Sequence, residues 1–155
     1  MNRFWKIVFA APFLLLLLLI TSCSRISVAK PEGFAEIKEK DYYRAVSPEG
    51  VLYSVRIARN KPQMDLEFWA KALKNHLEKE GYRVLTEDGE SFKSGERDGI
   101  LYEWGVPYGN EDYIYLTAIV VSGKTIAIAE AGGEHTDYRS YRNVLLDSLK
   151  SLTIR

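Results

Sequence analysis

Residues 113–121 are apolar on both faces, and this constrains the fold more than any other feature of the chain. Successive residues of a strand point to opposite sides, so Tyr113 and Tyr115 begin one face while Ile114 and Leu116 begin the other. An antiparallel strand with one solvated side carries polar residues at alternate positions. We therefore expect a central sheet strand that is covered on both sides.

Two amphipathic helices are predicted, and they can supply this cover, one on each face. The first spans residues 65–80, with Asp65 as the N-cap and Gly81 as the left-handed residue after its end. The second spans residues 137–150. Apolar positions recur at helical spacing in both, and we expect Trp69 and Leu73 to be core residues. The two stripes are Leu66, Trp69, Leu73 and Leu77, and then Tyr138, Tyr141, Leu145 and Leu149.

Strand candidates joined by short turns predict an antiparallel sheet. Residues 51–59 alternate, with Val51, Tyr53, Val55 and Ile57 on one face, and residues 41–47 are the expected hairpin partner across Pro48-Glu49-Gly50. Asp88-Gly89 and Ser122-Gly123 suit two-residue hairpin turns. The fold class that follows is α+β, an antiparallel meander with amphipathic helices packed on its faces; Ala127, Ala129 and Ala131 would let one helix approach closely. The other strand candidates are residues 82–86, 91–93, 99–106, 113–121 and 125–131.

This order of two strands, a long helix, a meander and a final helix resembles the PsbP-like fold, which includes bacterial lipoproteins of the DcrB type. Members of this fold are mostly accessory, assembly or binding proteins rather than enzymes. The resemblance therefore implies a non-catalytic role, and it transfers no active-site residues. The segments that carry it are Phe68-Trp69-Ala70-Lys71-Ala72-Leu73, Gly81-Tyr82-Arg83-Val84, Ile126-Ala127-Ile128-Ala129, Gly132-Gly133-Glu134 with Tyr138, and Leu145-Leu146-Asp147-Ser148-Leu149.

The first residues of the chain predict export. Arg3 and Lys6 precede an apolar run over residues 7–20, and small residues follow it, which is the pattern of a secretory signal peptide. The run is shorter than the roughly 20 apolar residues that a membrane-spanning helix needs. Ile20-Thr21-Ser22-Cys23 closely resembles the lipobox of bacterial lipoproteins. That resemblance implies cleavage between Ser22 and Cys23 and attachment of lipid to the Cys23 thiol and new amino group.

The lipobox interpretation divides the chain into a signal peptide over residues 1–22, a lipidated tether over residues 23–34 and one α+β domain over residues 35–155. There are two alternatives: an uncleaved membrane-spanning segment, and a plain secretory signal that leaves Cys23 unmodified. Ser24 follows the cysteine, and in enterobacterial lipoproteins a residue other than aspartate there favours transfer to the outer membrane. The expected location is the bacterial cell envelope, lipid-anchored and facing the periplasm.

The charge balance argues against some partners. Loss of Arg3 and Lys6 with the signal peptide leaves 19 of the 21 basic residues against all 21 acidic ones, a net charge near −2. Nucleic-acid recognition depends on a basic surface, so we expect no nucleic-acid partner. The net charge also gives no reason to coat an anionic leaflet. The expected partners are the membrane, through the anchor, and an envelope protein.

Candidate residues for chemistry are few. His76 has Glu80 one helical turn later, and His135 stands between Glu134 and Asp137. A zinc site takes three or four nitrogen, sulfur or carboxylate ligands, and lipidation would remove the chain's one thiol. We expect exposed helix residues and helix capping, with no metal and no cofactor. A hydrolase or a metal-binding domain that uses the His135 neighbourhood is the alternative.

Acidic and glycine motifs are also weak signals of chemistry. Glu87, Asp88 and Glu90 cluster beside a predicted turn, where we expect them to be solvated. Gly132-Gly133 precedes the second predicted helix but lacks the lysine and further glycines of a phosphate loop. No nucleophile motif is present in the mature sequence. These observations favour a protein that is not an enzyme.

Aromatic side chains are the best candidates for a binding site. Tyr102 and Trp104 share one strand face, Tyr113 and Tyr115 share another, and Tyr108 lies in the loop between. Tyrosine and tryptophan are enriched in binding hot spots, although burial under a helix and cross-strand packing explain them equally well. A sugar- or peptidoglycan-binding module would require an open groove lined by Tyr102, Trp104 or Tyr108. We predict a membrane-anchored, non-catalytic binding or assembly accessory.

Overall fold

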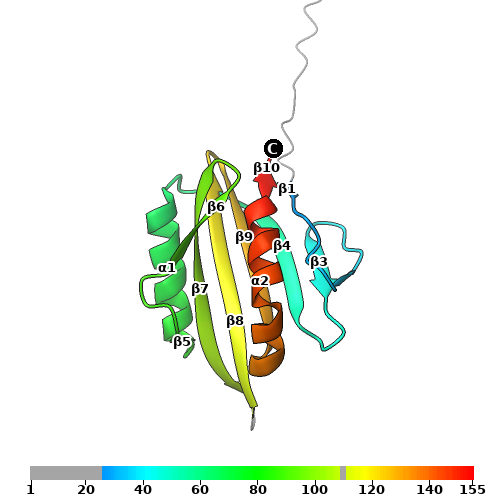
Figure 1. Ribbon diagram of the computed structural model, residues 1–155. Helices are drawn as coiled ribbons and strands as arrows, with labels where there is room; N and C mark the ends of the chain where they lie inside the picture. Colours follow the sequence, from blue (N-terminus) through cyan, green and yellow to red (C-terminus); the bar gives the residue numbers. More distant parts are fainter. Residues whose placement is uncertain (1–25, 109–110) are drawn as a thin grey trace, which may run out of the picture.

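Figure 1 shows a computed structural model, which describes residues 26–108 and 111–155. In this part of the chain an eight-stranded antiparallel sheet has the strand order β2-β3-β4-β9-β8-β7-β5, and β6 pairs with β7 beside β5. Strands β1 and β10 form a separate two-stranded ribbon. The elements are β1 (Ile26–Ser27), β2 (Ala35–Glu36), β3 (Tyr43–Val46), β4 (Leu52–Arg59), α1 (Leu66–Lys79), β5 (Arg83–Val84), β6 (Glu90–Ser94), β7 (Arg97–Tyr108), β8 (Glu111–Ser122), β9 (Thr125–Glu134), α2 (His135–Ser151) and β10 (Thr153–Ile154).

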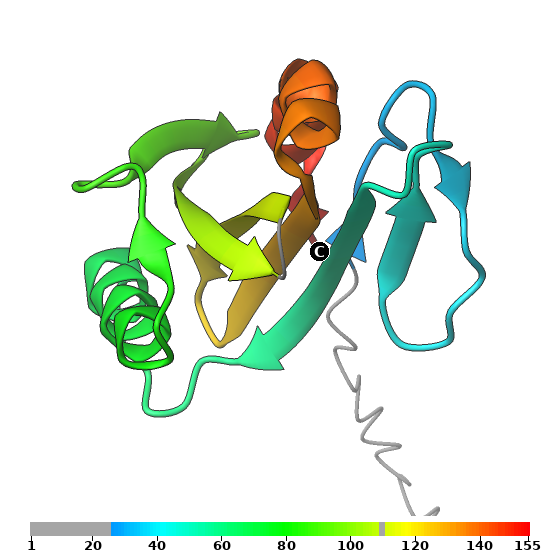
Figure 2. The same ribbon diagram turned by 90° about the horizontal axis from the view of Figure 1, so that it is seen from below.

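The two helices cover opposite faces of the sheet, as the two apolar faces of residues 113–121 predicted. Helix α2 packs over β8 and β9, with Leu145 in the same core as Leu116. Helix α1 lies over the β7 edge of the other face, where Ala70 packs with Trp104. In Figure 2, α2 crosses the top of the sheet and α1 lies at its left edge. The predicted α+β class, with an antiparallel sheet between helices, is confirmed.

Small residues of β9 allow the sheet to pack closely under α2. Ala127, Ala129 and Ala131 are at most 2% exposed and belong to the α2 core. A Cβ atom on Gly133 would lie only 2.8 Å from Cγ2 of Val51, so a side chain has no room there. Gly132 and Gly133 both lie inside β9 rather than in a loop.

Helix α1 begins and ends where the sequence predicted. The Asp65 carboxylate accepts a hydrogen bond of 2.8 Å from the backbone N–H of Phe68, and Gly81 has a φ of 90°. The apolar stripe is rotated relative to the prediction, because Ala70 and Leu77 are the buried positions. Leu73 is only half-buried.

Trp69 is also half-buried, and it is held by a polar contact rather than by the core. Its indole N–H donates a 2.7 Å hydrogen bond to Oδ1 of Asn60. Asn60 is 6% exposed, and its amide donates to the carbonyl oxygens of Met64 and Gly123. Trp69 therefore joins α1 to the loop that precedes it, and its assignment as a core residue is wrong.

Two of the three predicted hairpins are present, and the turn of the second is displaced by one residue. Pro48-Glu49-Gly50 joins β3 to β4, with Val46 opposite Leu52. The β8–β9 hairpin turns at Gly123 and Lys124, one residue later than the predicted Ser122-Gly123, because Ser122 still pairs with Thr125 in the sheet. Asp88-Gly89 does not close a hairpin, because β5 and β6 pair with two successive parts of β7 and run in the same direction. The turn there lets one sheet edge be completed by two short strands.

The N-terminal segment is packed on the domain from Ile26 onward. Ile26 pairs with Ile154, and the backbone N–H of Ala29 donates a 2.8 Å hydrogen bond to Oγ of Ser151. Phe34 is 3% exposed within the α2 core. Residues 26–34, which we had predicted to belong to the tether, are thus part of the folded domain. The predicted lipidation and cleavage residues, Ser22 and Cys23, lie outside the described residues.

Among the described residues, neither helix combines the length and the apolar character needed to cross a membrane.

Candidate functional site

The face of the sheet under α1 is only partly covered. Helix α1 lies at the β7 edge, and the neighbouring part of the face, over β4, β8 and β9, holds an open cavity of about 560 Å³. Leu52 on this face is 41% exposed, whereas Val51, which faces α2, is fully buried. We call this cavity the tyrosine groove. Its principal lining residues are Leu52, Tyr82, Val106, Tyr113, Tyr115 and Gly132.

A missing side chain creates the floor of the groove. Gly132 lies in register between Leu52 on β4 and Tyr115 on β8. A Cβ atom on Gly132 would have its nearest neighbours at 3.6 Å, the carbonyl oxygen of Ile114, and at 3.7 Å, the ring of Tyr115. These are ordinary contact distances, so packing does not require glycine here. The glycine leaves space that a larger residue would fill.

A polar group borders the apolar floor. The Tyr115 hydroxyl donates a 2.6 Å hydrogen bond to Oε1 of Glu130, and Nε of Arg56 lies 3.4 Å from Oε2 of the same carboxylate. Burial, followed by the hydrogen bond and charge of Glu130, raises the pKa of Tyr115 well above its ordinary range. Tyr115 therefore stays protonated and keeps donating to Glu130. The groove offers an apolar surface beside an anchored carboxylate.

The aromatic candidates divide between core and groove. Tyr102 and Trp104 are 6% and 0% exposed beneath α1, and the indole N–H of Trp104 donates to Oγ1 of Thr117. They do not line an open groove. Tyr113 and Tyr115 do line one, and they lie on the same sheet face as Trp104, with Trp104 directly opposite Tyr115. Their predicted placement on a different face is wrong.

Tyr82 was missed as a groove residue. It follows α1 directly, and its ring packs against the Tyr115 ring with centroids 5.7 Å apart and an angle of 49°. The side chain of Tyr108 is not among those that the structure describes. The signal that could have indicated the groove is Gly132, because a glycine inside a strand often marks a place where something approaches the backbone closely.

A buried carboxylate, Glu103, lies on the other face of the sheet under α2. Its side chain is 4% exposed and accepts hydrogen bonds from the Tyr138 hydroxyl at 2.7 Å and from Nε of Arg142 at 2.7 Å. Nη1 of Arg139 donates to its second oxygen at 3.2 Å, and Arg142 also binds Glu90 at 2.7 Å. Both carboxylate oxygens of Glu103 therefore have partners. Because Glu103 lies on β7 and Glu90 on β6, the network joins α2 to both strands.

The network sets the ionisation of Glu103 and Tyr138. Burial by itself would raise the pKa of Glu103, but the hydrogen bonds from Tyr138 and Arg142 and the charges of Arg142 and Arg139 outweigh it, so the pKa is lowered. Burial, and then the charge and hydrogen bond of Glu103, raise the pKa of Tyr138 well above its ordinary range. The carboxylate is charged and the phenol neutral near pH 7, which is the pairing that stabilises α2 on the sheet.

The histidine candidates do not gather into one site. His76 is exposed on α1, and His135 is the exposed first residue of α2. The Glu134 carboxylate caps α2 by accepting from the backbone N–H groups of Thr136 and Asp137 at 2.8 and 3.2 Å. In the described part of the chain, no three histidine, cysteine, aspartate or glutamate residues are placed to share a metal ion.

A second cleft lies beside α2. It has a volume of about 540 Å³ and includes His135, Arg139, Arg83 and Asp112, but neither Glu134 nor Asp137. Glu87 and Asp88 are exposed at their turn, and Glu90 is paired with Arg142. The acidic groups that the sequence suggested for chemistry are therefore used for capping, pairing or solvation.

Comparison with known proteins identifies the fold. No protein-family model matches the sequence, and no curated protein matches it. Solved structures do match, and they place the domain in the PsbP-like α+β class, as the sequence resemblance implied.

Three structural neighbours illustrate the match. LpqN of Mycobacterium tuberculosis, described as involved in cell envelope biogenesis, has a TM-score of 0.65 at 13% identity over 84% of this chain and 83% of LpqN. CyanoP, the PsbP of Synechocystis sp. PCC 6803, has a TM-score of 0.58 at 8% identity over 85% and 92% of the two chains. A Bacteroides thetaiotaomicron protein has a TM-score of 0.55 at 10% identity, over 84% of this chain and 45% of that one. At such identities the likeness establishes the fold alone.

Proposed function

We propose that this protein is a lipid-anchored, non-catalytic accessory of the bacterial cell envelope that binds a partner protein through the tyrosine groove. The observation that carries the proposal is the uncovered part of the sheet, where Leu52 and the groove tyrosines form an apolar surface. Exposed apolar surfaces bordered by polar groups mark interaction sites. The lipobox at Ile20-Thr21-Ser22-Cys23 and the envelope role stated for LpqN support the location.

The chemistry of the groove indicates what it binds. Leu52, Val106 and the tyrosine rings favour an apolar side chain of the partner, and the space above Gly132 can receive it. The Glu130 carboxylate beside this space accepts hydrogen bonds. A partner segment with an apolar residue next to a hydrogen-bond donor fits best. No reacting group is needed for this role.

The groove can be tested by site-specific crosslinking in the envelope. A photo-crosslinking residue in place of Leu52 should give one dominant adduct, and Gly132→Leu in the same chain should remove it by filling the floor. Gly105→Leu is the matched control, because Gly105 is also inside a strand and its Cβ would have its nearest neighbour at an ordinary 3.5 Å, away from the groove. An adduct that persists with Gly132→Leu would argue against the groove.

The anchor is tested separately by mass spectrometry of the mature protein. We expect a chain that begins at Cys23 and carries a diacylglyceryl thioether and an amide-linked acyl chain. Cys23→Ala should leave an uncleaved precursor or a soluble domain. An unmodified Cys23 in the membrane-purified mature protein would refute the anchor without bearing on the groove.

A sugar ligand is the second candidate function for the same groove. The tilted pair of Tyr82 and Tyr115 rings beside the Glu130 carboxylate combines an aromatic platform with a hydrogen-bond acceptor, which suits a carbohydrate. Titration with soluble peptidoglycan fragments, read from tyrosine fluorescence, distinguishes the two candidates. Saturable binding that Gly132→Leu abolishes would favour the sugar, and its absence together with a protein adduct would favour the partner protein.

A further inference from the structure

The point where the chain leaves the domain limits how far the domain can move from its membrane. Only three Cα-to-Cα steps separate Cys23 from Ile26, the first residue of β1, so this link spans at most about 11 Å when fully extended. Charges on the membrane surface act over a Debye length of about 8 Å at physiological ionic strength. The end of the domain that carries the β1–β10 ribbon is therefore within reach of the field of the lipid headgroups.

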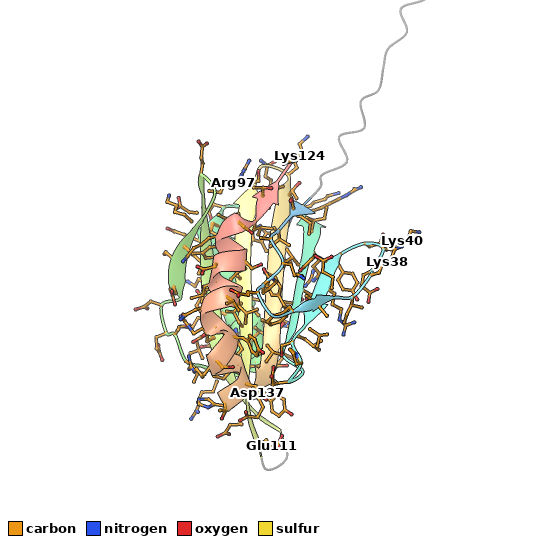
Figure 3. The ribbon with its side chains drawn as sticks, turned by 45° about the vertical axis from the view of Figure 1, so that its right-hand side comes forward. Lys38, Lys40, Arg97, Glu111, Lys124 and Asp137 are labelled. Carbon is orange, nitrogen blue, oxygen red and sulfur yellow. The ribbon has the colours of Figure 1, made fainter. Side chains whose placement is uncertain are left out.

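That end of the domain is rich in cations. The β8–β9 hairpin with Lys124, the turn that carries Arg97, and the ribbon lie together, as Figures 1 and 3 show. The backbone N–H of Asn60 donates to the carbonyl oxygen of Lys124, which places Lys61 there as well. The exposed cations of this end, none of which has an ion-pair partner among the described residues, are Arg59, Lys61, Arg97, Lys124 and Arg155.

Acidic residues at the same end do not cancel these cations. Asp98 and Asp147 are paired with Lys93 at 2.6 Å and Lys150 at 3.1 Å, so they neutralise other lysines. The further exposed acids of the nearby loops and first turn of α1 are Asp65, Glu67 and Glu96. Five unpaired cationic side chains against three acidic ones leave the side chains of this end net positive, although the mature chain has a net charge near −2.

The opposite end of the domain has the opposite sign. Glu111 and Asp137 lie there, at the far ends of β8 and α2 from Lys124 (Figure 3). Asp112 and Glu134 belong to the same end, where Arg83 is an exposed cation and Arg139 is paired with the buried Glu103, so acids outnumber cations there. The charges are thus arranged along the long axis of the sheet, positive where the chain leaves toward the anchor and negative at the far end.

We propose that the cation-rich end docks on the anionic phospholipid surface of the membrane that holds the anchor, so that the domain stands in one orientation on it. This inference rests on the proposed lipidation of Cys23. Each cation near an anionic surface strengthens binding by about fivefold, or about 1 kcal/mol. The short link supplies the proximity, and the cations select which end of the domain faces the lipid.

The orientation places the tyrosine groove away from the membrane. Gly132 on the groove floor is seven residues along β9 from Thr125 at the hairpin, which corresponds to roughly 23 Å at the rise of a strand. The groove therefore faces the periplasm, where a partner can reach it. An unoriented domain on the same short link would spend part of its time with the groove against the lipid.

Fluorescence quenching by a lipid-tethered nitroxide tests the orientation in the lipidated mature protein. Cys23 is the chain's one cysteine and is blocked by lipid, so Glu96→Cys and Glu111→Cys each accept a single dye, at the cationic end and at the opposite end. In phosphatidylcholine vesicles containing phosphatidylglycerol, we expect strong quenching at position 96 and little at position 111. In phosphatidylcholine alone, the difference between the two positions should become smaller, because the short link then holds the end of the domain near the lipid without fixing its tilt.

Charge reversal supplies the decisive comparison. Lys61→Glu with Lys124→Glu should lower the ratio of docked to undocked domains by at least about 25-fold, because two cations are lost at about fivefold each. The matched control is Lys38→Glu with Lys40→Glu, an equal change of charge at the side of the domain (Figure 3), and it should leave the quenching unchanged. Equal quenching at both positions, or equal effects of the two double variants, would overturn the proposal. Failure of the protein to float with either kind of vesicle would instead show that the anchor is absent.

Discussion

The two faces of the sheet are closed to different extents, although residues 113–121 are apolar on both. Under α2, the N-terminal segment fills the space beside the helix, with Phe34 edge-on to Tyr141 at a centroid distance of 5.2 Å. Under α1, the tyrosine groove remains open beside the helix. A helix is about 10 Å wide and strands lie about 4.8 Å apart, so one helix covers about two strands. Closing a wider face takes a second covering segment, and only the α2 face has one in the described part of the chain.

The difference separates stability from recognition. The α2 face contains the larger core and the Glu103 network, in which both carboxylate oxygens have partners within the domain. The α1 face has a smaller core around Trp104 and an apolar surface left for another molecule. Mutations on the α2 face should therefore lower the stability of the domain, and mutations in the tyrosine groove on the α1 face should lower partner binding.

The largest effect is expected in the core under α2. Leu145→Ala should lower the free energy of unfolding by about 2–5 kcal/mol, because it removes a fully buried side chain and leaves a cavity. Urea unfolding followed by circular dichroism measures the change. Leu52→Ala, on the exposed part of the other face, is the control and should change stability by less than about 1 kcal/mol. Similar losses in the two variants would contradict the division between the faces.

The next largest effect concerns the Glu103 network and its dependence on pH. Because the pKa of Glu103 is lower in the folded protein than its ordinary value of 4.5, its contribution to stability is present above that pH and is lost as the pH falls through the folded pKa. Glu103→Gln should cost about 2 kcal/mol at neutral pH and should flatten the acid loss of stability. Melting curves between neutral and acidic pH test this.

Asp98→Asn is the matched control for the network. Asp98 is paired with Lys93, but both side chains are more than half exposed, at 67% and 68%. Exposed ion pairs contribute roughly 0–1 kcal/mol, so this variant should follow the parent protein across the pH range. An equal loss in both variants would mean that burial of Glu103 has no special effect.

A smaller effect is expected at Trp69, which the structure places at the edge of the α1 core. Trp69→Phe keeps most of the ring but removes the N–H that donates to Asn60, and we expect a loss of about 1 kcal/mol. Leu77→Ala, at a buried position of the same helix, should cost more. Equilibrium unfolding of the two variants ranks them, and the opposite order would restore Trp69 as the main core residue of α1.

The smallest effect on stability is expected at the groove floor. Gly132→Leu should change the free energy of unfolding by less than about 0.5 kcal/mol, since a Cβ atom there meets its neighbours at ordinary contact distances. Gly133→Leu, one residue further, should be strongly destabilising because of the 2.8 Å approach to Val51. Thermal melting compares the two variants, and a large loss for Gly132→Leu would mean that the floor is needed for folding rather than left free for a partner.

Most of the strands and both helices could be predicted from local patterns. The apolar alternation of residues 51–59 and the Asp65 and Gly81 caps depend only on neighbouring residues, so they survive in the fold. The strand pairing around Asp88-Gly89 could not be predicted from local patterns. The pair does form a turn, but whether the flanking strands pair with each other or with a third strand is decided by β7, which comes later in the chain.

The groove was less accessible to prediction than the elements around it. Tyr113 and Tyr115 were recognised as candidates, yet the pairing of β7 with β8 decides that they share a face with Trp104. Helix α1 then buries Trp104, whereas Tyr115 lies beside the helix, partly buried, and lines the groove. Which aromatic residues are core and which are exposed depends on where one helix lies, and the spacing of residues within a strand contains no information about that.

By itself, the sequence determined the α+β class, the requirement for cover on both faces and the expectation of a lipid anchor, because periodicity, caps and a cleavage motif are local properties. The tertiary structure decided how far the cover extends, which charges meet at each end and at which residue the folded domain begins after the predicted anchor. The pairing of Ile26 with Ile154 joins the two ends of the described chain, and no local pattern specifies it. Contacts between residues so distant in sequence depend on the geometry of the whole sheet, and the proposed groove and docking end both result from such contacts.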